Sequence, residues 1–174
     1  MQTKFLGAQL QYATFNGCQL MNLDMSSANV DNANFVKANL ERANLSRAEG
    51  YRADFTHANL AGANLRGSKF RKSIFSSSSF SNIDLTDAIL SDCVMRDLVF
   101  TGAILSGAKF KNINFENCSF DSLATEGAVF ENCTGFVGVE NQQLRSGFKG
   151  KSASAVKDGE LVDRLIGTKA AELQ

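Results

Sequence analysis

The chain of 174 residues has no proline and no tryptophan, two tyrosines and a single histidine. Proline has no backbone N–H to donate, so its absence is compatible with a backbone that is hydrogen-bonded along its whole length. Its 18 basic and 18 acidic side chains cancel, which excludes a global field that attracts nucleic acid or anionic membrane. No segment reaches the roughly 18 consecutive apolar residues of a membrane helix.

The first residues also lack the pattern of a secretory signal. Unless a targeting segment precedes this sequence, we expect a soluble, cytoplasmic protein without membrane contact.

Residues that commonly carry chemistry are scarce. None of the four cysteines, Cys18, Cys93, Cys118 and Cys133, shows the C-x-x-C spacing of redox or zinc motifs. His57 has no second histidine with which to form a metal site or a catalytic pair. The chain also lacks a P-loop, a G-x-G-x-x-G fingerprint and a nucleophile elbow. We therefore expect no enzymatic activity, catalytic residue, cofactor or metal, and we expect buried cysteines that act as small apolar residues.

The sequence has a period of five residues. In the stretch "ANLERANLSRAEGYRADFTHANLAGANL", residues 38–65, Ala-Asn-Leu begins at 38, 43, 58 and 63. Every fifth residue from Phe5 to Phe130 is Phe, Leu, Met or Val except Gly50 and Thr125, and the residue two positions earlier is mostly Ala, Ser, Cys or Thr. Neither a helix nor a strand has this period. One small and one large side chain in each unit point inward, and the other three residues face water.

The tandem motif Ala-(Asn/Asp)-(Leu/Phe)-X-X resembles the pentapeptide repeat family over roughly residues 3–135. The resemblance implies an all-β solenoid, a right-handed quadrilateral β-helix in which four units make one coil. Residues 1–135 would then form about six to seven stacked coils that share one core, with residues 20 apart as neighbours on one face. At Gly50 we expect a small void or a kink, because a large core side chain is missing there.

The frame ends after Thr134. Residues 136–157 are predicted as a loop or linker, because residues 145–157 are rich in Gly, Ser and Lys. Residues 158–174 are predicted as a C-terminal helix, with Asp158 as N-cap and an apolar stripe at helical spacing. Because the end of a β-helix exposes apolar side chains and unpaired backbone, the helix either caps the last coil or docks on another chain.

The N-terminal end has no such cap. Three explanations stay open here: end-to-end self-association, further sequence in a longer protein, or closure by the side chains of residues 1–9.

Two functions from different classes fit the chain. The first is a non-enzymatic protein–protein interaction scaffold or regulator with an unidentified protein partner. The second comes from the family: some members resemble DNA in shape and negative charge and bind type II topoisomerases such as gyrase. Neutral overall charge disfavours this alternative, because residues 1–72 carry nine basic and five acidic residues, while residues 73–135 carry three basic and eight acidic. Direct nucleic-acid binding is not expected, since the phenylalanines that could stack on bases point inward.

One region is a candidate partner surface, formed by Arg47, Tyr51, Arg52, Arg71 and Lys72. The 20-residue spacing places Tyr51 beside Arg71, and Arg52 beside Lys72. Tyrosine and arginine dominate the energetics of many interfaces, and an acidic partner would suit this group. Two alternatives remain: an ordinary solvated surface, or a Tyr51 ring that turns inward to fill the space that Gly50 leaves.

Overall fold

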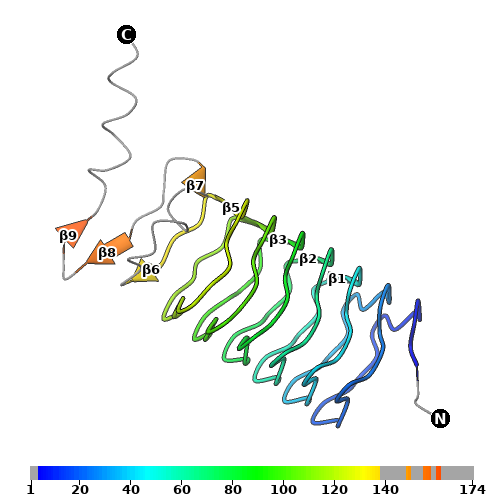
Figure 1. The fold of residues 1–174 in the computed structure, drawn as a ribbon. Coiled ribbons are helices and arrows are strands. Elements are labelled where there is room, and N and C mark those ends of the chain that lie inside the picture. Colours follow the sequence, from blue (N-terminus) through cyan, green and yellow to red (C-terminus); the bar gives the residue numbers. More distant parts are fainter. Residues whose placement is uncertain (1–3, 138–147, 150–154, 158–159, 162–174) are drawn as a thin grey trace.

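The fold is a four-sided β-solenoid, seen as a rod of stacked coils in Figure 1. The computed structural model describes residues 4–137, 148–149, 155–157 and 160–161. Parallel bridges join residues 20 apart along the chain, from the pair Lys4 and Asp24 to the pair Asn114 and Thr134. The backbone turns once in each five-residue unit, so four sides make a coil. The all-β solenoid that the resemblance to the family implies is confirmed.

On one side of the rod the bridges lengthen into short strands. These are β1 (Glu49–Tyr51), β2 (Lys69–Arg71), β3 (Ile89–Ser91), β4 (Lys109–Lys111) and β5 (Val129–Glu131). They pair in parallel, each residue opposite the one 20 positions later. Strand β7 (Phe148–Lys149) continues the sheet by pairing with β5.

The core is a column of stacked side chains along the rod axis. Phe15, Phe35, Phe55 and Phe75 stack with centroid separations of 4.9, 4.8 and 5.0 Å and nearly parallel planes. The column exists because the spacing of paired strands, about 4.7–4.9 Å, falls within the range of about 4.5–7 Å between centroids at which offset-stacked rings attract. Most inward side chains from Leu23 to Phe136 are buried.

The corners of the coils have a left-handed backbone. Every fifth residue from Gly7 to Asn132 has a positive φ. This conformation costs an L-residue roughly 1–2 kcal/mol, whereas Gly adopts it freely and Asn and Asp tolerate it. Most corners are Gly, Asn or Asp. The left-handed backbone explains this preference, which the five-residue period alone does not explain. The other corners are Tyr12, Ser27, Lys37, Arg42, Arg47, Arg52, His57, Lys72, Ser77 and Ser122.

The Asn or Asp before each large apolar residue has a structural role. Oδ1 of Asn34 accepts the N–H of Val36 at 3.0 Å, and Oδ1 of Asp84 accepts the N–H of Thr86 at 2.9 Å. These side-chain turns satisfy a backbone donor just before the corner. The Asn of the Ala-Asn-Leu motif therefore fixes the turn, although its side chain lies on the outside.

At Gly50 the structure has neither the void nor the kink that we predicted, so this prediction is wrong. Strand β1 pairs in regular register through Gly50 and Phe70. The ring of Phe70 fills the space: its Cδ1 and Cε1 lie 2.6 Å from the point where a Cβ on Gly50 would stand. Phe70 also makes edge contacts with Phe55 and Phe75, at 5.6 and 5.4 Å between centroids.

The C-terminal end of the solenoid is covered. Phe136 packs on Phe115 and Phe120, with ring centroids 5.0 and 5.3 Å apart, and β7 pairs with the last strand of the face. Phe136 thus covers the last coil near Phe120. Where the structure describes the predicted loop over 136–157, it contains β6 (Phe136–Val137), β7 and β8 (Ala155–Lys157).

The predicted helix over 158–174 is wrong at Glu160–Leu161, which form strand β9 and pair antiparallel with β8. The sequence Asp158-Gly159 between these strands is typical of a tight hairpin turn, and this signal competes with the reading of Asp158 as a helix N-cap. Residues 158–159 and 162–174 lie outside the described residues. Within the described part of the chain, no helix is long and apolar enough to span a membrane.

Candidate partner-binding edge

One corner of the rod carries a cluster of cations around a tyrosine. The strand register places Tyr51 directly beside Arg71. The corner residues Arg52 and Lys72 follow them, with φ of 56° and 55°, and the Arg52 N–H donates to the Arg71 carbonyl at 3.0 Å. We call Tyr51, Arg52, Arg71 and Lys72 the cationic edge.

The half-buried ring of Tyr51 lies outside the core and close to two exposed cations. Cζ of Arg52 is 5.1 Å and Nζ of Lys72 is 5.9 Å from the ring centroid. The Tyr51 N–H donates to Oδ1 of Asp31 at 2.7 Å. This geometry excludes the alternative in which Tyr51 fills the space at Gly50, which Phe70 occupies. Each cation–π contact at such an exposed site is worth about 0.5–1 kcal/mol, enough to bias the side chains toward one arrangement.

Two cations of the edge have no acidic partner. Lys69 pairs with Glu49 at 3.0 Å between Nζ and Oε1, and Arg71 lies 3.6 Å from Asp92 between Nε and Oδ2. Among the described residues, neither Arg52 nor Lys72 has an ion-pair partner. Their charge is therefore not neutralised within the rod and is available to an anionic group of another molecule.

Arg52 and Lys72 also depart from the preference for Asn or Asp in their column of corner residues. From residue 32 to residue 132 this corner column reads Asn32, Arg52, Lys72, Asp92, Asn112 and Asn132, all with positive φ. Apart from Tyr12 in the first coil, the column is otherwise Asn or Asp, the non-glycine residues best suited to a left-handed backbone. Positions at which a sequence departs from its own local preference are those where function is expected.

Arg47 does not join this group. It occupies the preceding corner, five residues earlier, and is therefore one side of the coil away from Arg52. Its N–H donates to the Arg66 carbonyl at 2.8 Å. Of the five residues proposed from sequence, the structure brings four together and leaves Arg47 on another edge.

The cysteines and the histidine form no alternative site. Cys93, Cys118 and Cys133 are buried, and burial raises the pKa of their thiols to about 12, 11 and 11. Each Sγ lies near a carbonyl of the preceding coil, as in the 3.5 Å contact from Cys93 to Phe70. Such thiols stay protonated and unreactive near neutral pH. His57 is exposed at a corner. The described residues contain no group of His, Cys, Asp and Glu that could hold a metal ion.

Comparison with known proteins agrees with this geometry. Residues 51–130 match the family described as "Pentapeptide repeat region", and residues 3–42 and 24–49 match "Pentapeptide repeats (8 copies)". No curated protein sequence matches the chain significantly.

Among solved structures, a trypsin-treated form of QnrB1, described as a plasmid-mediated fluoroquinolone resistance protein, is similar with a TM-score of 0.70 and 16% identity. The match covers 76% of this chain and 67% of that one. HetL, a pentapeptide repeat protein involved in heterocyst differentiation regulation in the cyanobacterium Nostoc sp. strain PCC 7120, matches with a TM-score of 0.40 and 22% identity. That match covers 72% of this chain and 62% of HetL. Both the five-residue sequence frame and the four-sided coils thus lead to one conclusion, that this chain belongs to the pentapeptide repeat family.

Proposed function

We propose that this protein is a non-enzymatic scaffold that binds an acidic partner protein at its cationic edge. The observation that carries the proposal is the arrangement of Arg52 and Lys72, two exposed cations that have no ion-pair partner among the described residues and lie over the half-buried Tyr51 ring. Arginine and tyrosine supply much of the binding energy at protein interfaces. The outward side chains stand on a rigid backbone lattice, so the edge loses little conformational entropy when a partner binds.

An acidic partner is the chemistry that suits this edge. Complementary charge speeds association and suppresses partners of the wrong sign. A carboxylate of the partner can reach the Arg52 guanidinium or the Lys72 ammonium without first displacing a salt bridge of the rod. The tyrosine adds an apolar face with a hydroxyl, which allows packing as well as a hydrogen bond.

Mimicry of DNA toward gyrase is not favoured. The resistance role belongs to QnrB1, and a likeness at 16% identity extends to the fold alone. A DNA mimic needs negative charge along most of the rod, but residues 1–72 have a net charge of +4 from nine basic and five acidic side chains. In a gyrase supercoiling assay we expect neither inhibition nor protection from a quinolone.

The test is affinity capture from extracts of the source cell, with quantification of every captured protein. The edge variant Arg52→Glu/Lys72→Glu is compared with a control of identical charge change, Lys37→Glu/Lys109→Glu. Lys37 and Lys109 are both exposed and lie away from the edge. We expect an acidic partner that the wild type and the control capture and the edge variant does not. Equal capture by the edge variant would contradict the proposal.

A further inference from the structure

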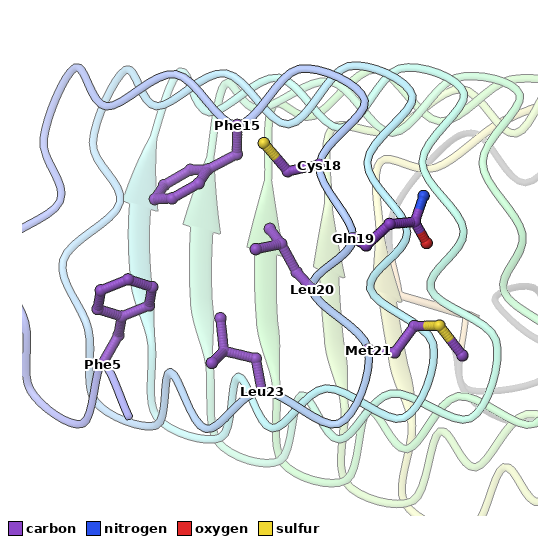
Figure 2. A pocket seen from close by; sticks show the side chains of 7 residues that line it. All are labelled: Phe5, Phe15, Cys18, Gln19, Leu20, Met21 and Leu23. Atoms are coloured by element: carbon purple, nitrogen blue, oxygen red, sulfur yellow. The ribbon is translucent and has the colours of Figure 1, made fainter. Parts of the chain in front are cut away.

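Among the described residues, which start at Lys4, the first coil leaves an apolar hollow open, whereas Phe136 covers the last coil. Figure 2 shows Phe5, Phe15, Leu20 and Leu23 around it, and its volume is about 600 Å³. In every later coil the equivalent side chains are covered from both sides. Leu6, Tyr12 and Met21 lie near this end and are 64, 77 and 46% exposed.

The backbone at this end has unused hydrogen-bonding groups. In the second coil, the Asn29 N–H donates to Ala8 O at 3.0 Å and its carbonyl accepts the Leu10 N–H at 2.8 Å. A residue at this repeat position therefore directs both backbone groups toward the preceding coil. Gln9, Thr14 and Gln19 are the equivalents in the first coil. Among the described residues, their N–H and C=O groups have no backbone partner toward this end.

This pattern is complementary to itself. In an antiparallel pair, two residues that each turn N–H and C=O to the same side exchange both hydrogen bonds. Two rods that meet end to end about a two-fold axis bring their first coils together in antiparallel directions. The same residues of both copies then supply donors and acceptors, as a symmetric interface requires.

The charge of the first coil also permits contact between two copies. Lys4 is its only charged residue, because residues 5–23 contain no Asp, Glu, Lys or Arg. Proteins usually protect an open strand edge with charges, proline or bulges, and this end has almost none of these devices. The other end is covered by Phe136 and β7, so association through free ends stops at two copies.

We propose that the N-terminal end of the rod binds the same end of a second copy, which gives a head-to-head dimer. The dimer closes the two apolar hollows against each other and satisfies the free backbone groups of Gln9, Thr14 and Gln19. It also presents two cationic edges on one elongated particle. This inference rests on the first coil alone and does not depend on the identity of the partner at the cationic edge.

The test measures the mass of the full chain by sedimentation and light scattering over a wide range of concentrations. The end variant Leu6→Lys/Met21→Lys places charges on exposed positions at the hollow, where the fold tolerates them. The control Val99→Lys/Ile104→Lys makes the same change at apolar positions that are 47 and 38% exposed in the middle of the rod.

We expect a dimer for the wild type and the control, and a dimerisation weaker by about a hundredfold or more for the end variant, because like charges then meet across the interface. Circular dichroism and melting temperature check that each variant is folded. Small-angle scattering should give a maximum dimension nearly twice that of the monomeric end variant. A wild type that is monomeric at all concentrations, an end variant that still dimerises, or a compact side-by-side dimer would each overturn the proposal.

Discussion

The ring of Phe70 occupies the space above Gly50, with Cδ1 and Cε1 2.6 Å from the position that a Cβ at residue 50 would take. Val30 Cγ2 lies 3.1 Å from the same point on the other side. A methyl group at residue 50 would therefore push a buried ring that is already in contact with Phe55 and Phe75. We predict that Gly50→Ala lowers the free energy of unfolding by about 1–3 kcal/mol, measured by urea denaturation.

A double-mutant cycle isolates this contact. Phe70→Leu alone removes ring volume and is expected to destabilise the rod, whereas Gly50→Ala should cost much less when Phe70 is already Leu. The control is Ala48→Gly, which removes a methyl group two residues away and creates no clash. If the losses of stability for Gly50→Ala and Phe70→Leu are additive, the ring of Phe70 is not the reason why residue 50 is a glycine.

The corners allow stability and binding to be separated. Arg52→Asn and Lys72→Asn place a residue that tolerates positive φ at a left-handed corner, so each should raise the free energy of unfolding by about 1 kcal/mol or less. The same variants should weaken partner binding. Lys37→Asn makes the equivalent change at another corner and should raise stability without any loss of binding. The account of the edge is wrong if Arg52→Asn and Lys72→Asn bind as well as Lys37→Asn does.

The buried thiols predict a loss of stability at high pH. Burial raises the pKa of Cys93 to about 12 and those of Cys118 and Cys133 to about 11, above the ordinary value of 9.0. Between the ordinary and the raised values the unfolded chain releases protons that the folded chain retains. The contribution of these thiols to stability should therefore be constant below about pH 8.5 and fall above it, by up to about 1.4 kcal/mol per pH unit for each thiol.

The measurement is chemical unfolding between pH 7 and pH 10.5, compared with the variant Cys93→Ala. We expect a shallower alkaline decline for the variant, because one of the three raised thiols is absent. A thiol reagent provides an independent reading: partly exposed Cys18 should react quickly in the native protein, and the three buried cysteines only on unfolding. Fast reaction of all four thiols would contradict the burial of this column.

Much of the solenoid is predictable from the sequence because the five-residue frame specifies which side chains enter the core. The neighbour relations of Tyr51 with Arg71 and of Arg52 with Lys72 follow from the 20-residue spacing. Arg47 is close to Arg52 in the sequence, but five residues correspond to a full side of the coil, so the two side chains lie on different edges. The direction of Tyr51 depends on whether Phe70 fills the space at Gly50, and that depends on packing against Phe55 and Phe75.

Other features carry weaker signals. The left-handed corners are visible in sequence as recurring Gly, Asn and Asp, but basic residues interrupt the series between Lys37 and His57. Beyond Thr134 no period constrains the chain, and Asp158 begins a helix in one interpretation and a hairpin turn with Gly159 in the other. The local sequence is ambiguous there because the pairing of β8 with β9 depends on contacts with the rest of the fold and not on local preference alone.

The central claim is that the cationic edge binds a protein partner through Arg52 and Lys72. It is tested most directly by the dissociation constant of the captured partner for three purified forms of the full chain, measured by isothermal titration calorimetry. Wild type and Lys37→Glu/Lys109→Glu should bind alike, and Arg52→Glu/Lys72→Glu should bind at least about tenfold more weakly, a difference of 1.4 kcal/mol or more. Equal constants for all three forms would contradict the claim.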